Sequence, residues 1–114
     1  MSRNIEMIRG DTAGFYFQRI DAEGEVITTQ PESLYFTVKK NFNTIPFVLQ
    51  KKLEDMRMDE EGTWHFTIEP EDTEELSYKT YVYDIQVVQD GVKTTIAKGG
   101  FAIKEEVTFI ENED

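Results

Sequence analysis

The chain has 114 residues, of which 23 are acidic and 12 are basic, so its formal net charge is −11, and it contains no cysteine. A chain of this length usually forms one domain, which buries about two thirds of the surface that the unfolded chain exposes. The lack of cysteine excludes disulfides, thiolate metal sites and a cysteine nucleophile. The negative charge opposes binding to nucleic-acid phosphates and to anionic membranes, so we expect neither as a partner.

No apolar run approaches the roughly 20 residues that span a bilayer, and the polar first residues lack the apolar core of a signal peptide. We therefore expect neither a transmembrane segment nor a signal peptide. The composition is 39% hydrophobic and 12% aromatic, which is enough to form a folded core. We expect one domain over residues 1–110, followed by an acidic tail at 111–114 that frays.

Hydrophobic residues recur mainly with a period of two, which is typical of strands that bury one face. The candidate strands, in chain order, cover residues 5–9, 15–20, 34–39, 47–51, 64–68, 81–87, 94–103 and 107–110. Three of them have clear inward faces, formed by Leu34, Phe36 and Val38, by Trp64, Phe66 and Ile68, and by Tyr81, Tyr83, Ile85 and Val87. Phe15, Phe17 and Phe101 are also expected to point inward.

The segments between the candidate strands contain recognisable turn residues. Asp90 and Gly91 form the pair that favours a type I′ turn, so the flanking strands should form an antiparallel hairpin. Two acidic turns that end in glycine are expected at residues 21–24 and 59–62. The pair Gly99 and Gly100 predicts a bulge, because Ile96 cannot share a face with Phe101 without one extra residue.

A short helical turn is expected at residues 70–76, where Asp72 and Glu75 have the spacing of a capping box. This turn leads into a strand that begins with Tyr81, as in the corner of immunoglobulin-like domains where a tyrosine hydroxyl bonds back to the turn. Trp64 on the preceding strand would then lie in the core. We predict an all-β, immunoglobulin-like antiparallel sandwich of seven or eight strands with one short helical turn near 70–76.

No residue has the setting that catalysis requires. His65 is the only histidine, and its expected position faces solvent with no nucleophile placed beside it. The carboxylates are scattered, so no pair stands out as the acid and base of a glycosidase. Asp84 is the most unusual because it lies among apolar residues, and we expect it either to pair with a lysine or arginine across the sheet or to be an edge charge that blocks aggregation. We predict no catalytic residue.

We also predict no cofactor or metal site. The acidic runs at 59–61 and 69–75 lack the pattern of a calcium-binding EF-hand loop, and the glycines form no phosphate-binding motif. Residues 9–11 spell Arg-Gly-Asp, a tripeptide that adhesion receptors recognise, but a match of three letters arises easily by chance. We expect Gly10 to let the chain turn while Asp11 or Thr12 bonds to nearby backbone N–H groups.

The chain has fourteen aromatic residues, and most are expected in the core. Those left on outward faces or in loops are candidates for a contact with a partner protein. They are Tyr16, Tyr35, Phe42 and Tyr78.

Several of these patterns, taken in order, resemble the small immunoglobulin-like domains of tailed-phage and prophage structural proteins, in particular the N-terminal domain of upper-baseplate proteins. They are Arg-Gly-Asp-Thr at 9–12 leading into Phe-Tyr-Phe at 15–17, the turn at 21–24, the strand at 34–39, Gly62 with the strand after it, the turn at 70–76, Tyr-Val-Tyr-Asp-Ile at 81–85 and Gly-Phe-Ala-Ile at 100–103. This resemblance covers nearly the whole chain. It implies a role in assembly without chemistry.

We therefore expect a non-catalytic assembly module of a phage or prophage virion that pairs with other virion proteins or with copies of itself. Its location would be the virion, after assembly in the bacterial cytoplasm. A glycan-binding module is the first alternative, and two or more coplanar exposed rings on a concave sheet face would favour it. A small hydrolase is the second, and it would need a pocket containing His65 or a desolvated pair of carboxylates.

Overall fold

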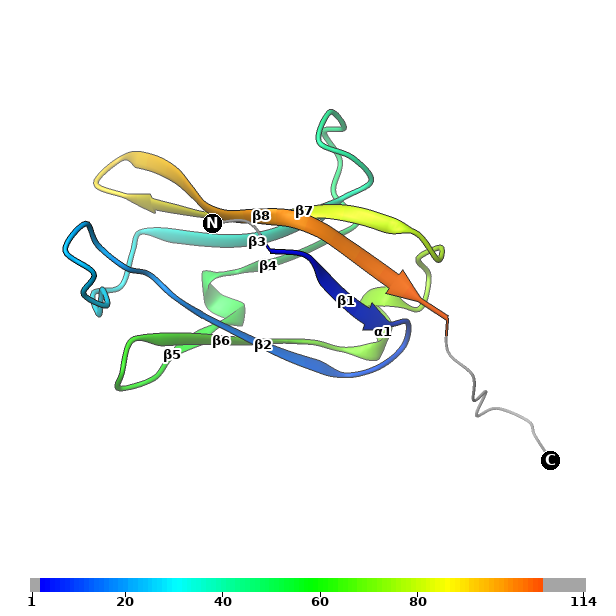
Figure 1. Ribbon diagram of the computed structural model, residues 1–114, viewed down its shortest axis with the longest axis horizontal. Helices are drawn as coiled ribbons and strands as arrows, with labels where there is room; N and C mark the ends of the chain where they lie inside the picture. Colours follow the sequence, from blue (N-terminus) through cyan, green and yellow to red (C-terminus); the bar gives the residue numbers. More distant parts are fainter. Residues whose placement is uncertain (1–2, 106–114) are drawn as a thin grey trace.

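The computed structural model describes residues 3–105, which form two facing sheets (Figure 1). The larger sheet contains, in spatial order, β1 (Ile5–Ile8), β8 (Val92–Lys104), β7 (Thr80–Gln89), β3 (Ser33–Lys39) and β4 (Leu49–Lys52). The smaller sheet contains β2 (Ala13–Gln18), β6 (Thr63–Ile68) and β5 (Arg57–Met58). A 3₁₀ turn, η1 (Leu53–Asp55), precedes β5, and a short helix, α1 (Pro70–Thr73), lies between β6 and β7.

The topology confirms the predicted immunoglobulin-like sandwich. The smaller sheet has the order of strands B, E and D of an immunoglobulin domain, and β8, β7, β3 and β4 follow the order G, F, C and C′. Among the described strands, every pairing is antiparallel except that of β1 with β8, which is parallel. The expected strand at 107–110 and the tail at 111–114 lie outside the described residues, whereas β5 was not expected from the sequence.

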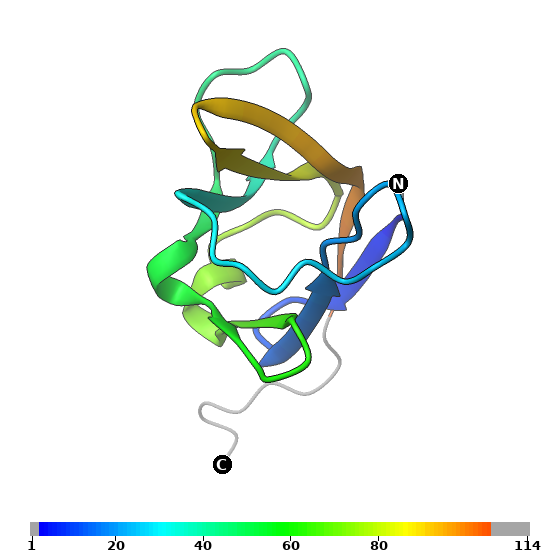
Figure 2. The same ribbon diagram turned by 90° about the vertical axis from the view of Figure 1, so that its left-hand side faces the viewer.

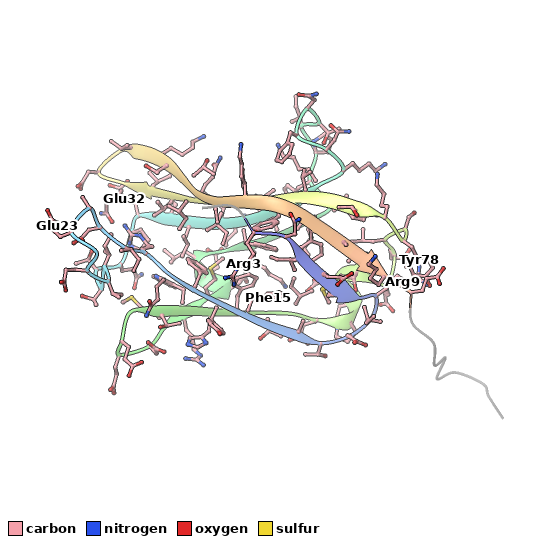
Figure 3. The ribbon with its side chains drawn as sticks, in the orientation of Figure 1. Arg3, Arg9, Phe15, Glu23, Glu32 and Tyr78 are labelled. Carbon is pink, nitrogen blue, oxygen red and sulfur yellow. The ribbon has the colours of Figure 1, made fainter. Side chains whose placement is uncertain are left out.

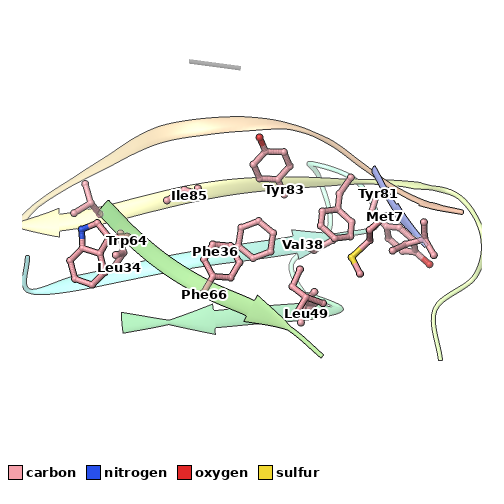
Figure 4. Close-up of a cluster of buried hydrophobic side chains, with 14 residues drawn as sticks. Met7, Leu34, Phe36, Val38, Leu49, Trp64, Phe66, Tyr81, Tyr83 and Ile85 are labelled. Atoms are coloured by element: carbon pink, nitrogen blue, oxygen red, sulfur yellow. The ribbon is translucent and has the colours of Figure 1, made fainter. Parts of the chain in front are cut away.

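The core lies between the two sheets, and the period-two prediction correctly identified its residues (Figure 4). All ten residues of the three inward faces are buried. Phe36 is at the centre, with its ring centroid 4.8 Å from that of Phe66, 5.6 Å from that of Tyr83 and 6.0 Å from that of Phe101. Each fully buried side chain of this size contributes about 1.5–3 kcal/mol to folding. Phe15 and Phe17, in contrast, are only half-buried.

The tyrosine corner is also present. The Tyr81 hydroxyl donates a 3.1 Å hydrogen bond to the backbone carbonyl of Ser77, in the turn just before β7. Trp64 lies in the core as expected, although its indole N–H is buried without an acceptor in the described part of the chain.

The prediction of the helix cap was wrong. The residue that precedes a proline favours an extended conformation, so Pro70 places the helix start immediately after Glu69. Asp72 therefore acts as the third residue of the helix, and its carboxylate accepts the Glu69 N–H at 2.8 Å. The helix ends at Thr73, whose hydroxyl accepts the N–H of Gly10 at 2.9 Å. This hydroxyl is therefore the hydrogen-bond acceptor for the turn after β1. We had expected a side chain from within the turn, Asp11 or Thr12, to bond to the backbone there.

The predicted hairpin is confirmed, but the bulge lies elsewhere. Asp90 and Gly91 both have positive φ, and they join β7 to β8. The register shifts at Ile96, because Ile85 pairs with Ala97 while the next residue of β7 pairs with Thr95. Gly99 and Gly100 therefore have a different role, which is to let the segment before β1 approach β8. A Cβ atom on Gly99 would overlap the Arg3 carbonyl, and the Gly100 N–H donates to Asn4 Oδ1 at 2.9 Å.

In the described part of the chain, no helix is long and apolar enough to cross a membrane.

Candidate functional site

The four aromatic residues predicted as an interface do not form one surface. Tyr16 lies on the outer face of the smaller sheet and is 74% exposed. Tyr35 is a half-buried residue of β3, and Phe42 is exposed in the loop between β3 and β4. Tyr78 lies just before β7 with the Arg9 guanidinium 4.3 Å from its ring centroid (Figure 3). The structure therefore separates these residues into different regions.

The loop between β3 and β4, here called the 41–47 loop, projects from the larger sheet (Figure 2). Phe42 is 60% exposed, Ile45 88% and Phe47 52%. Asn41 organises the loop, because its side-chain oxygen accepts the Asn43 N–H at 3.0 Å and its carbonyl accepts the Thr44 hydroxyl at 2.9 Å. The loop therefore holds three large apolar side chains in contact with water. Sequence reasoning identified Phe42 alone, because it assigned Phe47 to a strand that in fact begins at Leu49.

A hollow of about 650 Å³ lies beside the smaller sheet and includes Tyr16 and His65. His65 Nε2 is 3.0 Å from Asp59 Oδ2. The other Asp59 oxygen accepts backbone N–H groups from Glu61 at 2.9 Å and Thr63 at 3.0 Å. The hydrogen bond with His65, followed by those from the backbone, lowers the pKa of Asp59 to about 2. The pair thus stabilises the turn between β5 and β6.

This hollow meets one of the two alternative conditions stated for a small hydrolase and does not meet the other. It contains His65, but the carboxylates that line it, those of Glu54, Asp55 and Glu69, all belong to exposed residues. A carboxyl group that acts as a general acid near neutral pH must be desolvated, because desolvation raises its pKa. The exposed Tyr16 ring is tilted by 46° to the His65 ring, so these two rings do not form the coplanar pair that glycan stacking would use.

Asp84 lies on β7, in the middle of the larger sheet, where its register partner on β8 is Lys98. The structure thus places a lysine across the sheet, but no ion pair joins Lys98 to Asp84 in the described part of the chain. The hydrogen bond to the Asp84 carboxylate, however, comes from Gln86 at 3.4 Å. Burial raises the pKa of Asp84, and the charges of Lys39 and Lys98 partly oppose this shift.

Arg19 is a residue that sequence reasoning missed. The alternation of β2 places Ala13, Phe15 and Phe17 on its inner face, and Arg19 continues the same face just beyond the strand. Its side chain is only 8% exposed, and the guanidinium donates to the Thr29 carbonyl at 3.2 Å. Burial lowers its pKa. The period of two that located the core could have identified this position.

Within residues 3–105, no three histidine, aspartate or glutamate side chains are grouped so that they could hold a metal ion. This includes the described acidic runs at 59–61 and 69–75.

No protein-family model matches the sequence, and no curated protein matches it. Among solved structures, the chain is similar to part of the endo-β-1,4-mannanase from Thermotoga petrophila, with a TM-score of 0.59 and 11% identity. The match covers 90% of this chain but only 18% of the mannanase. The extracellular domain of the voltage-gated sodium channel β4 subunit, described as a parallel homodimer in cell–cell adhesion, matches with a TM-score of 0.45 and 10% identity, covering 99% of this chain and 93% of that one. At this identity, the mannanase match shows a shared fold alone.

Proposed function

We propose that this protein is a non-catalytic assembly module of a phage or prophage virion, which joins a tail or baseplate through contacts with other proteins. The 41–47 loop carries this proposal, because Phe42, Ile45 and Phe47, three large apolar residues of one short loop, are all exposed. Large apolar side chains that gather on one surface are typical of protein contact sites. Burying each of them against a partner would contribute about 1.5–3 kcal/mol.

Two further features support this role. The order of turns and strands resembles the N-terminal domains of upper-baseplate proteins, and this resemblance supports a contact within a virion that is assembled in the bacterial cytoplasm. The net charge of −11 would keep free subunits apart and would attract a partner with a basic surface. Such a partner is another virion protein or a basic region on a further copy of the chain.

Affinity capture tests this function. The tagged chain is incubated with a lysate of cells in which the source prophage has been induced, and the retained polypeptides are identified by mass spectrometry. We expect tail or baseplate polypeptides. Ile45→Asp should reduce their recovery about tenfold or more, because it places a charge in the apolar contact. Ala22→Asp adds the same charge to an exposed turn elsewhere and should leave recovery unchanged.

Two results would contradict the proposal. One is the recovery of sugars or peptidoglycan fragments without any tail polypeptide, which would favour a glycan-binding module. The other is equal recovery by Ile45→Asp and the unmodified chain, which would show that the 41–47 loop does not form the contact.

A further inference from the structure

Among the strands of residues 3–105, β2 is an unpaired edge of the smaller sheet, and none of its six residues is charged. The other edge strands are shorter, and each carries a charge. Strand β4 ends in Lys51 and Lys52, β1 contains Glu6, and β5 has two residues, one of which is Arg57. Charge and short length are the usual features that prevent a free edge from pairing with another strand. In the described part of the chain, β2 is therefore the edge best suited to accept a strand.

The sandwich is open beside this edge. A hollow of about 560 Å³ lies between β2 and the opposite sheet, lined by Phe15, Phe17, Ile5 and Ala97 among others. Arg3 lies at the same hollow, and Figure 3 shows Arg3 and Phe15 close together. The opening explains why Phe15 and Phe17 are only half-buried although they lie on an inner face. Alternate side chains of a strand added to β2 would point into this hollow.

A second hollow, of about 610 Å³, continues the first, because both are lined by Gln18 and Ile20. It contains Arg19 and Gln89. No carboxylate of residues 3–105 forms an ion pair with Arg19. The Gln89 side-chain oxygen is buried without a donor in the same part of the chain. Buried charges in proteins are normally paired, so this site is suited to a carboxylate from outside.

We propose that the two hollows along β2, together the β2 opening, bind an extended segment of a partner protein that has apolar side chains at alternate positions and one carboxylate. The backbone of the segment would extend the smaller sheet, and its apolar side chains would cover Phe15 and Phe17. Its carboxylate would accept hydrogen bonds from the Arg19 guanidinium, and one of its N–H groups would donate to Gln89. This inference rests on the proposed assembly function and names the surface and the chemistry of the partner.

The arrangement of the sheets favours a single segment over a second copy of the chain. The larger sheet has five strands and the smaller has three, and η1 packs against β3 and β4 at the side away from β2. The larger sheet therefore extends past the smaller one on the β2 side. Two β2 strands pair at a distance of about 4.8 Å. If the larger sheet of each copy extends past β2 by even one strand, also about 4.8 Å, the two larger sheets would collide before the β2 strands came that close. One added strand fits without this conflict.

Synthetic peptides test the proposal on the complete chain. The probes are peptides of eight residues that alternate valine with threonine, carry terminal lysines and contain one aspartate at a different position in each. Matched peptides carry asparagine instead. Binding is followed by the amide NMR shifts of the ¹⁵N-labelled chain. We expect shifts at residues 13–20 and 96–97, and the best aspartate peptide should bind about tenfold or more tightly than its asparagine match.

Variants of the chain then test whether Arg19 is the residue that binds the aspartate of the peptide. Arg19→Met should remove the preference for aspartate over asparagine, whereas Arg57→Met, an arginine on the opposite edge of the smaller sheet, should retain it. If Arg19→Met does not fold, the unmodified chain still decides the outcome. It should prefer the aspartate peptide over its asparagine match, and this preference should be lost at high salt. The proposal is wrong if no peptide shifts the β2 amides or if asparagine binds equally well. It is also wrong if light scattering shows a dimer and hydrogen exchange shows that dimerisation protects the β2 amides.

Failure of this test can be distinguished from failure of the proposed function. A chain that captures tail polypeptides but does not respond to the peptides at β2 retains its assembly role and lacks the strand-binding site.

Discussion

The hydroxyl of Tyr83 donates a 2.5 Å hydrogen bond to the backbone carbonyl of Arg3, which lies 80 positions earlier in the sequence. The same segment is held by a bond from the Arg3 N–H to the Lys98 carbonyl, at 3.2 Å, and by the bond between Gly100 and Asn4. Burial raises the pKa of Tyr83, which favours the protonated hydroxyl that donates this bond. The segment before β1 is thereby fixed against β7 and β8, beside the β2 opening.

Tyr83→Phe should release this segment. Because it removes one buried hydrogen bond, we expect the free energy of unfolding to fall by about 1 kcal/mol in urea denaturation. The Arg3 amide should also exchange its hydrogen faster. Tyr81→Phe is the matched control, since it removes the bond to Ser77 at a similar cost in stability but should leave the Arg3 amide unchanged. Unaltered exchange at Arg3 in Tyr83→Phe would show that the hydroxyl does not hold the segment.

Gly24 and Gly62 end two turns of similar design, in which Asp21 or Asp59 accepts backbone N–H groups from the residues two and four positions later. Their φ angles are +85° and +86°. A Cβ at Gly24 would meet nothing within 4 Å, whereas one at Gly62 would lie 2.7 Å from Val26 Cγ1. Gly24→Ala should cost about 1 kcal/mol of unfolding free energy through backbone strain, and Gly62→Ala about 1–3 kcal/mol more through crowding. Equal losses in urea denaturation would contradict this account.

Asp59→Asn should show a stability difference that depends on pH. The hydrogen bond with His65, together with those from the backbone, lowers the pKa of Asp59 from 3.8 to about 2, so its ionised form stabilises the fold fully above pH 3.8. This stabilisation is lost as the pH falls from 3.8 to about 2. Urea denaturation should therefore find Asp59→Asn less stable than the unmodified chain at pH 7 and nearly equal to it at pH 2. A difference of the same size at both values would rule out the carboxylate charge as its cause.

Asp84→Asn is expected to behave in the opposite way. Burial raises the pKa of Asp84, so the ionised carboxylate is less favourable in the folded chain than in the unfolded chain. The contribution of the Asp84 carboxyl group to stability therefore falls as the pH rises from its ordinary pKa of 3.8 to its raised pKa in the folded chain. The variant should be as stable as the unmodified chain, or more stable, at pH 7, and any advantage should disappear below the ordinary pKa of 3.8. A marked loss of stability at pH 7 would indicate that attraction to Lys39 and Lys98 outweighs the cost of burial.

The sequence predicted those features that depend on neighbouring residues. Leu34, Phe36 and Val38 alternate with polar side chains, and this local pattern is sufficient to define an inward face. The Asp90–Gly91 turn likewise depends on two adjacent residues. The role of Gly99 could not be found in this way, because it depends on the Arg3 carbonyl from the far end of the chain.

The candidate surfaces were predicted less well for the same reason. Ile45 is exposed because the 41–47 loop projects from the sheet, and a hydrophobic pattern alone does not reveal a projecting loop. Arg19 continues the alternation of β2, but its lack of an ion pair with any described carboxylate depends on which acidic side chains the fold brings near it. Local periodicity therefore identified the core, whereas the surfaces required the three-dimensional arrangement of distant segments.

Hydrogen exchange of the complex with the captured tail or baseplate polypeptide tests the assembly role most directly. In the complex, we predict slower amide exchange in the 41–47 loop and in β2 than in the free chain, because bound partners protect the backbone that they cover. Protection of the loop alone would contradict the addition of a strand to β2. Unchanged exchange in both regions would contradict the assembly surfaces proposed for this protein.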